Sequence, residues 1–251
     1  MRKFFVENEN VNLEEDKILI VGQDVNHIRN VLRLSLSEKI LICDKSNSKN
    51  YISEIEKIEN ESVSCKIIEE VEGESEGNVE LHIYQGLPKA DKMELIIQKG
   101  TELGINRYVP VKLSRCIVKL DGKDEIKKID RWQKISEVAA KQSGRDLVPE
   151  VERLKSLKEV TERVKDYDLF IVAFEEEKEN TLKKELLELK SKSSNYKIAC
   201  LIGPEGGLAL NEVEALKEAG TKVITLGNRI LRTETVAMYI ASTVMYELEM
   251  N

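Results

Sequence analysis

The hydrophobic pattern of the first third of the chain predicts short β-strands. Apolar or alternating runs recur at residues 4–6, 17–21, 39–43, 51–55 and 62–68. Polar, turn-forming residues such as Asp44 to Ser48 separate them. Several short strands at this spacing are typical of a small β-barrel.

One helical turn, residues 27–33, interrupts these strands. At helical spacing its apolar face carries Ile28, Val31 and Leu32. Arg29 and Arg33 are four residues apart and share another face, so together they are candidates to meet a phosphate. An equally weighted alternative is that His27 caps the turn and the two arginines are only solvated.

Beyond residue 78 the pattern changes to strands that alternate with helices, which favours a parallel α/β sheet. Strands are expected at 79–87, 107–111, 169–174, 198–202 and 223–226. Helices are expected at 91–103, around Trp132 as far as Ala140, at 160–167, 180–190, 212–219 and 233–248. Residues 73–78 are polar with two glycines, the composition of a linker. We therefore expect domains at 1–72 and 79–251.

Smaller expectations concern the ends and starts of helices in this second domain. Gly104 is placed to cap the helix over 91–103. The run Glu175 to Glu177 is interpreted as the solvated start of a helix.

Two loops follow the last two predicted strands, Leu201-Ile202-Gly203-Pro204-Glu205-Gly206-Gly207 and residues 226–235, Leu-Gly-Asn-Arg-Ile-Leu-Arg-Thr-Glu-Thr. The carboxyl edge of an open α/β sheet is where ligands bind. Neither G-x-x-x-x-G-K-[ST] nor a strand-borne G-x-G-x-x-G occurs, which disfavours a triphosphate. Tight turns are an alternative of about equal weight, but the crowding of Arg229, Arg232 and Glu234 favours a site.

Composition narrows the class of protein. The 251 residues are 41% hydrophobic, enough for packed cores. No run of eighteen apolar residues or signal-peptide core occurs, so we expect a cytoplasmic protein without membrane contact. The four cysteines lack C-x-x-C spacing and the chain has two histidines, so buried free thiols and no metal site are expected.

Charge is unevenly distributed. The whole chain carries a formal charge of −7, whereas residues 89–145 contain fourteen Lys or Arg against eight Asp or Glu, a net of +6. Such a stretch is either a solvated helical face or the footprint of a polyanion, and charge alone does not choose.

The motifs together resemble a known family, the bacterial small-subunit ribosomal RNA uridine N3-methyltransferases of RsmE type in the SPOUT superfamily. The resemblance covers nearly the whole chain. It rests on the two loops, on 27–33, Lys92-Met93-Glu94 with Gln98-Lys99 and Glu102-Leu103-Gly104, Ser114-Arg115-Cys116, Trp132 with Ala139-Ala140, and Gln142-Ser143-Gly144-Arg145. The stretch Arg229-Ile230-Leu231-Arg232-Thr233-Glu234-Thr235 is the most specific of these.

The resemblance implies an N-terminal PUA-like β-barrel that binds RNA and an α/β methyltransferase domain with a deep trefoil knot. It also implies S-adenosylmethionine as cofactor, a homodimer, and small-subunit (16S) ribosomal RNA or the 30S particle as partner. Topology rules based on pattern alone would have excluded the knot.

Site residues are expected as follows. The cofactor slot is assigned to Leu201, Ile202, Gly203, Gly206, Gly207, Leu226, Gly227, Ile230, Leu231 and Thr235. Uridine N3 must lose a proton before it attacks, so Arg232 is expected to stabilise the anion and Glu234 or Glu205 to accept the proton. The plainer alternatives are a salt bridge for Arg232 and a favourable helix-start position for Glu234. RNA is expected to contact Arg2, His27, Arg29, Arg33, Lys92, Arg115 and Arg145.

Two positions depart from the family pattern. Asn228 stands where proline is common, and Val236 begins a run where small residues are common. Rival functions are a SPOUT ribose 2′-O-methyltransferase of ribosomal or transfer RNA, and a non-catalytic RNA-binding assembly factor.

Overall fold

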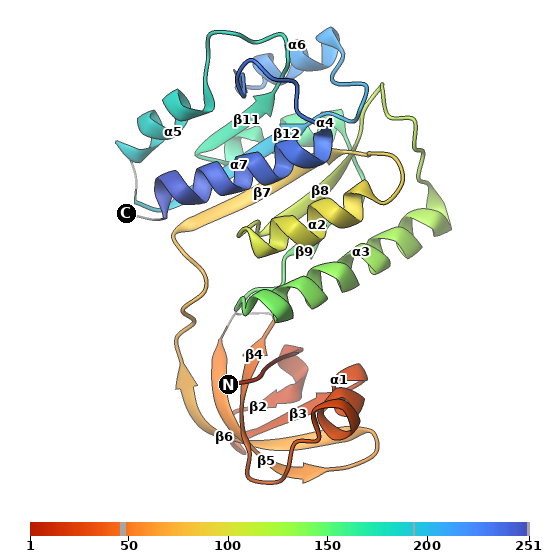
Figure 1. Cartoon of the computed structure of the whole chain (residues 1–251), viewed down its shortest axis with the longest axis vertical. Coiled ribbons are helices and arrows are strands. Elements are labelled where there is room, and N and C mark those ends of the chain that lie inside the picture. Colours follow the sequence, from red (N-terminus) through yellow and green to blue (C-terminus); the bar gives the residue numbers. More distant parts are fainter. Residues whose placement is uncertain (46–48, 193, 250–251) are drawn as a thin grey trace. The chain divides into compact units, whose positions relative to one another are not determined.

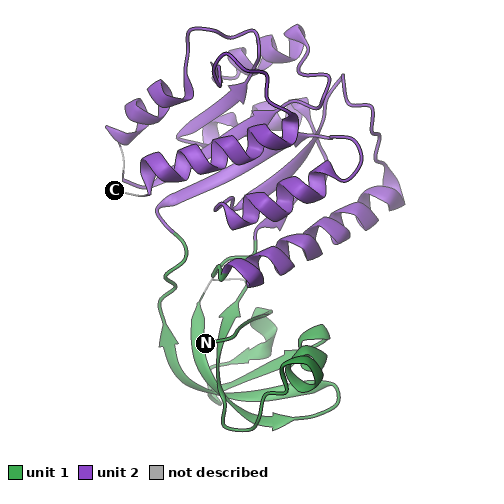
Figure 2. Cartoon of the chain, viewed as in Figure 1, with its two compact units in different colours: residues 1–76, 144–148 green, residues 77–143, 149–251 purple. Residues whose placement is uncertain are grey.

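The computed structural model describes residues 1–45, 49–192 and 194–249. The chain divides into two compact units, one of residues 1–76 with 144–148 and one of residues 77–143 with 149–249 (Figure 2). Each unit has its own hydrophobic core. The short return of 144–148 to the first unit was not foreseen from the sequence.

The first unit is a curled six-stranded sheet (Figure 1). Its elements are β1 (Lys3–Val6), η1 (Asn8–Asn10), β2 (Val11–Asn12), β3 (Lys17–Val21), α1 (Gln23–Asn26), η2 (His27–Leu32), β4 (Lys39–Asp44), β5 (Asn50–Ile58) and β6 (Ser62–Val71). The strand order is β1-β4-β5-β6-β3-β2. Within the described residues β1 and β2 do not pair, so the expected barrel is a curled sheet with two edges.

The turn at 27–33 is a π-helix, and this changes which side chains are buried. Ile28 is fully buried, but Val31 is 62% exposed, contrary to the prediction that it lies on the apolar face. Hydrogen bonds of the i→i+5 type widen the turn and move position i+3 away from the core. Arg33 ends the turn with φ +51°, so it does not continue the helical face of Arg29.

Asp146 anchors the segment 144–148 inside the first unit. Its buried carboxylate accepts hydrogen bonds from Lys3 Nζ, Asn50 Nδ2 and Ser75 Oγ. These bonds explain why residues 144–148 belong with the first unit.

The second unit is a seven-stranded sheet between two helical layers, with every strand pair parallel as predicted. Its elements are β7 (Val79–Gly86), α2 (Lys92–Glu102), β8 (Arg107–Lys112), α3 (Gly122–Ser143), β9 (Glu150–Val151), β10 (Lys155–Ser156), α4 (Leu157–Glu162), η3 (Val164–Asp166), β11 (Leu169–Ala173), α5 (Leu182–Lys190), β12 (Tyr196–Ile202), α6 (Leu210–Glu218), β13 (Lys222–Ile224) and α7 (Thr233–Leu248). The order is β10-β8-β7-β12-β11-β13, with β9 beside β8.

Two cores cover the two faces of this sheet. Side chains of α2, α3, α5 and α7 pack on one face and those of α4 and α6 on the other. Successive residues of each strand serve opposite cores, as Cys200 and Leu201 do. Gly104 has φ +95° and follows α2, as expected for a helix-ending glycine.

Two further observations bear on the sequence expectations. Cys43, Cys65, Cys116 and Cys200 are all free thiols, and three of them are buried. Over the described part of the chain, no helix is both long and apolar enough to cross a membrane.

Candidate functional site

A cavity of about 860 Å³ opens at the carboxyl edge of the second sheet. Its walls come from the segments that follow β11, β12 and β13. Parallel strands end at one edge, so these three loops converge although they are separated by up to fifty residues of sequence. Both glycine-containing loops predicted as a site therefore contribute to one cavity.

The loop after β12 is a tight turn. The N–H of Gly207 donates to the carbonyl of Pro204 at 2.9 Å, and Gly207 has φ +69°, a conformation that favours glycine. A Cβ on Gly203 would lie 3.0 Å from the main-chain carbon of Gly207. Glycine at 203 thus lets the two arms of the turn approach closely and exposes main-chain groups to the cavity.

A buried hydrogen-bond chain joins this turn to the start of α7. Thr233 Oγ1 donates to the carbonyl oxygen of Gly203 at 2.8 Å, and Gln85 Nε2 donates to Thr233 Oγ1 at 2.9 Å. Gln85 ends a central strand and is completely buried. Its Oε1 has no hydrogen-bond partner among the described residues. Sequence reasoning missed Gln85, although a glutamine at the end of a buried strand was a signal.

Lys92 lies between the two carboxylates that were predicted to be catalytic. Its Nζ is 2.9 Å from Glu205 Oε1 and 3.4 Å from Glu234 Oε2. The contact with Glu234 is the longer and weaker of the two, and Glu234 Oε2 is buried. The structure thus brings together two residues predicted as catalytic and one predicted to bind RNA.

The carboxylates of Glu205 and Glu234 differ in the hydrogen bonds that they accept. Burial opposes ionisation of Glu205, but hydrogen bonds from Lys92 and from the N–H of Lys89 outweigh it and lower the pKa of this carboxyl. The hydrogen bond to Glu205 in turn raises the pKa of Lys92. Glu205 is therefore an ionised ion-pair partner and a weakened base.

Arg232 and Glu234 stand at the N-terminus of α7. Arg232 is the N-cap residue, is exposed and lines the cavity. Glu234 is in the first turn of the helix, where the helix dipole stabilises a carboxylate. Arg232 therefore brings a positive charge to the cavity, and Glu234 places a carboxylate two positions further along the helix.

Most residues expected to form the cofactor slot line the cavity. They are Ile202, Gly203, Gly206, Gly207, Leu226, Gly227, Ile230 and Leu231, together with Glu205 and Arg232. Leu201 does not, because strand alternation turns it into the core on the α4–α6 side. Thr235 is exposed and also lies outside the lining residues. We leave Leu201 and Thr235 out of the proposed slot.

Glu175 is a cavity residue that the sequence reasoning did not select. The segment 175–177 is a turn and not the predicted helix start, and α5 begins only at Leu182. A Cβ on Gly207 would come within 2.6 Å of Glu175 Oε1. The carboxylate of Glu175 therefore lies directly against the glycine turn.

The residues expected to bind RNA fall into two groups. Arg2, His27, Arg29 and Arg33 are exposed in the first unit, and Arg29 Nη1 donates to Asn60 Oδ1 at 2.6 Å. In the second unit Arg115 is exposed but its Nη1 donates to the carbonyl of Gly206 at 2.9 Å, so it also braces the glycine turn.

Arg145 is different. It is only 5% exposed and is paired with Glu76, which leaves it turned away from solvent. We therefore omit it from the proposed RNA surface.

Two family models match the chain. Residues 75–245 match the family model of the RNA methyltransferase domain, and residues 20–68 match that of the RNA methyltransferase PUA domain. The cavity lies wholly within the first of these matches.

Individual relatives extend the likeness to the whole chain. Ribosomal RNA small subunit methyltransferase E of Bacillus subtilis is 37% identical, with 100% of this chain and 98% of the relative covered. The protein of the same name from Mesomycoplasma hyopneumoniae is 30% identical, with 96% and 97% covered. The crystal structure of such an enzyme from Neisseria gonorrhoeae, bound to S-adenosyl methionine, is 27% identical with a TM-score of 0.82 and covers 98% and 97%.

Proposed function

The chain belongs to the ribosomal RNA small subunit methyltransferase E family, and from this premise we propose that it methylates N3 of a uridine. The coarser activity, S-adenosylmethionine-dependent methylation of small-subunit ribosomal RNA, follows from family membership. The observation that carries the finer proposal is the carboxylate of Glu234, which lies 3.4 Å from Lys92 in the first turn of α7, two positions after the cavity residue Arg232.

The cavity fits the cofactor. Its glycine turn leaves no room for a Cβ at Gly203, and apolar side chains of Ile202, Leu226 and Leu231 line it beside main-chain donors and acceptors. An adenosine is recognised by such a combination of apolar walls and main-chain polar groups. When bound, S-adenosylmethionine supplies an electrophilic methyl group on a sulfonium.

Glu234 is proposed as the proton acceptor. N3 of uridine carries a proton and becomes nucleophilic only when that proton leaves. Glu205 is poorly suited because hydrogen bonds from Lys92 and Lys89 lower its pKa. Within the described residues Glu234 Oε2 accepts no main-chain hydrogen bond, and its contact with Lys92 at 3.4 Å is longer than the 2.9 Å contact between Lys92 and Glu205.

Arg232 is proposed to stabilise the uridine anion. Removal of the N3 proton leaves negative charge shared with the neighbouring carbonyl oxygens of the base. A guanidinium at the cavity mouth, on the N-cap of α7, offers a charge-assisted donor to that edge. The pair therefore divides proton removal and charge stabilisation between two residues two positions apart.

The product identifies the reaction. We suggest incubating the protein with methyl-labelled cofactor and small subunits from a strain lacking this gene, then digesting the RNA to nucleosides. We expect labelled 3-methyluridine. A ribose 2′-O-methyl product would replace this proposal with the related ribose methylation, and no label would support a non-catalytic assembly role.

Matched variants separate the two carboxylates. Glu234→Gln should lower single-turnover rate by about 10²-fold or more with nearly unchanged cofactor affinity. Glu205→Gln serves as the control and should lose less rate. Arg232→Ala should also lower the rate far more than cofactor binding; equal rates in Arg232→Ala and the parent protein would remove the anion-stabilising role.

RNA recognition is proposed for the first unit, which contains the PUA match. Arg2, His27, Arg29 and Arg33 are all exposed there. Contacts of arginines with phosphates make affinity fall steeply with salt. Affinity for small subunits that stays constant between low and moderate salt would argue against this assignment.

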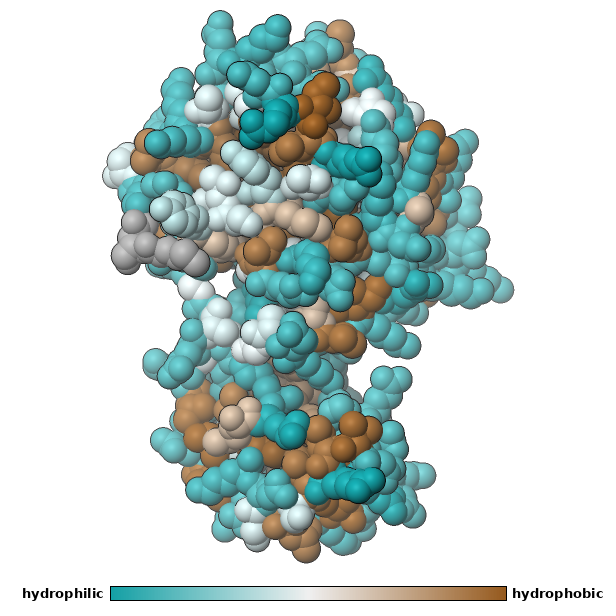
Figure 3. All heavy atoms as spheres, in the orientation of Figure 1, coloured by the Kyte–Doolittle hydropathy of each residue, from teal (hydrophilic) through white to brown (hydrophobic). Residues whose placement is uncertain are grey.

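A homodimer is proposed from the outer face of α7. The exposed residues Thr235, Tyr239, Ser242 and Tyr246 recur at helical spacing, and no charged residue occurs from 235 to 246. Figure 3 shows weakly polar and apolar surface along the course that α7 takes in Figure 1. Tyr246, 70% exposed, is the most exposed aromatic of this face.

Light scattering tests the dimer. The parent protein should have twice the mass of one chain, and Tyr246→Asp should shift it toward the monomer. A parent protein that is monomeric at micromolar concentration would overturn this proposal.

A trefoil knot is also proposed for the second unit. Two contacts support it: Thr225 bridges to Thr181, and Thr233 is bonded to Gly203, so the segment between β13 and α7 is held by two earlier loops. When the chain is pulled from both ends in a single-molecule experiment, a tightened knot would shorten the fully extended length. An extension equal to that of the whole untied chain would exclude the knot.

A further inference from the structure

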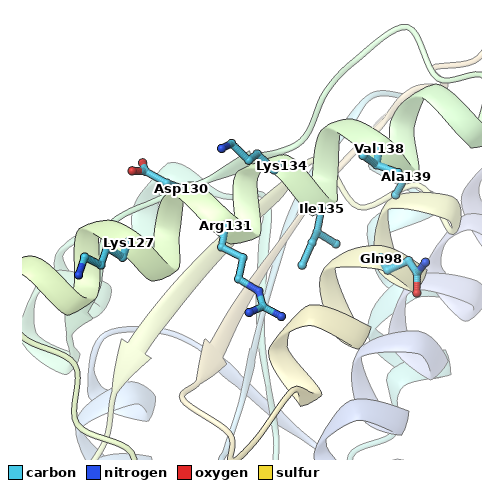
Figure 4. Close-up of a pocket in the computed structure, with 8 residues that line it drawn as sticks. All are labelled: Gln98, Lys127, Asp130, Arg131, Lys134, Ile135, Val138 and Ala139. Carbon is cyan, nitrogen blue, oxygen red and sulfur yellow. The ribbon is translucent and has the colours of Figure 1, made fainter. Parts of the chain in front are cut away.

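A second cavity, about 530 Å³, lies between α2 and α3. We call it the α2–α3 groove. In Figure 4, Arg131 and Ile135 project from α3 toward α2, from which Gln98 borders the same space. It shares no lining residue with the cavity at the sheet edge.

The groove combines an apolar floor with a basic rim. Ile135, Val138 and Ala139 supply apolar surface, and Val138 is 66% exposed. Lys127 and Lys134 are exposed on the same helix, seven positions apart and so on one face. Adjoining apolar side chains with a polar rim are typical of a surface that a ligand or partner covers.

Among the described residues that line the groove, basic side chains outnumber acidic ones. Arg131 donates to Glu94 Oε2 at 2.7 Å, and Asp130 is the acidic residue of the lining. Three basic side chains, Lys127, Arg131 and Lys134, stand against the carboxylates of Asp130 and Glu94, which leaves a net charge of +1. This agrees with the net charge of +6 over residues 89–145, fourteen basic minus eight acidic, in a chain of net charge −7.

The groove and the proposed methyl-transfer site each include a residue of α2. Lys92 begins α2 and contacts Glu205 and Glu234, whereas Gln98 is six residues further along the same helix. At 1.5 Å per residue the two positions are separated by about 9 Å along the axis. A nucleic-acid strand whose target base lies near Lys92 can therefore place an adjoining nucleotide in the groove.

We propose that the α2–α3 groove binds an unpaired nucleotide of the RNA close to the target uridine. The base rests on the floor of Ile135 and Val138, and Lys127 and Lys134 meet the phosphates. A cavity of this size accommodates a nucleotide, and apolar contact with an unstacked base plus phosphate contact is how proteins hold single-stranded RNA. The inference rests on the proposed function in taking RNA as substrate.

The test compares two double variants with the same change in charge. The rim variant combines Lys127→Glu with Lys134→Glu and reverses the charge of both rim lysines. The α5 control combines Lys183→Glu with Lys184→Glu, at two exposed lysines of α5. Binding of naked small-subunit ribosomal RNA and of intact small subunits is measured between 50 and 200 mM salt. Calorimetric titration with S-adenosylmethionine checks that each variant is folded.

The rim variant should bind naked RNA roughly tenfold more weakly than the α5 control at the low-salt end. Its slope of log affinity against log salt should be shallower by about 0.7 for each lost contact with a single-stranded phosphate. Val138→Asn, which leaves the charges in place, should weaken binding with an unchanged slope.

Two outcomes overturn the proposal. Equal affinity and slope for the rim variant and the α5 control would exclude the groove as an RNA contact. Weaker binding to intact subunits with unchanged binding to naked RNA would assign the groove to a ribosomal protein instead. Failure of the proposed function itself is seen separately, as absence of 3-methyluridine in the parent protein.

Discussion

The hydroxyl of Thr233 donates a 2.8 Å hydrogen bond to the carbonyl oxygen of Gly203, and this bond ties the start of α7 to the glycine turn. Both residues are buried. The side chain of Thr233 thus holds the two loops of the cavity together, and its hydroxyl also accepts a hydrogen bond from Gln85 Nε2. The contact therefore links the two loops that line the cavity.

Thr233→Val should weaken cofactor binding and destabilise the second unit. The isosteric change removes the 2.8 Å donor to the Gly203 carbonyl and one of the acceptors of Gln85 Nε2, which keeps its bonds to the carbonyls of Gly86 at 2.9 Å and Gly203 at 3.4 Å. The loss of these buried hydrogen bonds costs about 1 kcal/mol. Calorimetric titration and urea unfolding measure the two effects. Thr161→Val, which removes an exposed hydroxyl hydrogen bond on α4 away from the cavity, is the control, and equal losses in both variants would contradict the role of the bond.

Arg115→Ala distinguishes bracing of the turn from contact with RNA. Loss of the hydrogen bond to Gly206 should weaken cofactor binding by a few-fold, since an exposed charge-assisted bond contributes about 0.5–1 kcal/mol. The salt dependence of RNA binding should stay unchanged. A shallower salt slope with unaltered cofactor affinity would instead favour a phosphate contact.

Asp146→Asn should destabilise the first unit at neutral pH by about 2 kcal/mol. Burial opposes ionisation, but hydrogen bonds from Lys3, Ser75 and Asn50 lower the pKa of Asp146 from 3.8 to about 2. Because the folded-state pKa is depressed, this stabilisation is present above pH 4 and is lost as pH falls toward 2. The difference from the parent protein in urea unfolding should shrink over that interval.

Glu74→Gln is the control for Asp146, because Glu74 is an exposed carboxylate on the neighbouring segment. It should change stability little and without this pH dependence. A constant difference between Asp146→Asn and the parent from pH 6 to pH 3 would show that the ionised form is not what stabilises the unit.

His82 should make the second unit less stable in mild acid. Burial, then the charges of Arg107, Lys197 and Arg163, lower the pKa of His82 to about 3, and the half-exposed carboxylate of Glu80, 2.8 Å from Nε2, opposes this shift. The unfolded chain therefore binds this proton first, and the free energy of unfolding should fall by up to about 1.4 kcal/mol for each pH unit below 6.5.

Unfolding of His82→Gln in urea at pH 7.5, 6.5 and 5.5 checks this sign. The variant should lose less stability on acidification than the parent. An identical pH dependence in both proteins would mean that His82 is not the group responsible.

In the second unit, the pattern of apolar and polar residues was sufficient to predict which segments form helices and which form strands. The helix predicted at 233–248 has the same bounds in the structure, and the parallel strands follow the apolar runs. Burial of a helix face or strand imposes a period on the sequence, so the period reveals the element. In the first unit the same reasoning misplaced Val31, because a π-turn and an α-turn are not distinguished by a segment this short.

By itself the sequence determined that two glycine-containing loops follow strands at one sheet edge, that residues 89–145 are basic, and which family the motifs resemble. Only the tertiary structure decided that Lys92 joins Glu205 and Glu234, that Gln85 and Glu175 contact the loops of the cavity, that Leu201 faces the core, and that Arg145 is buried against Glu76. The physical reason is that strand order and side-chain direction bring together residues more than a hundred positions apart, and no local period records those pairings.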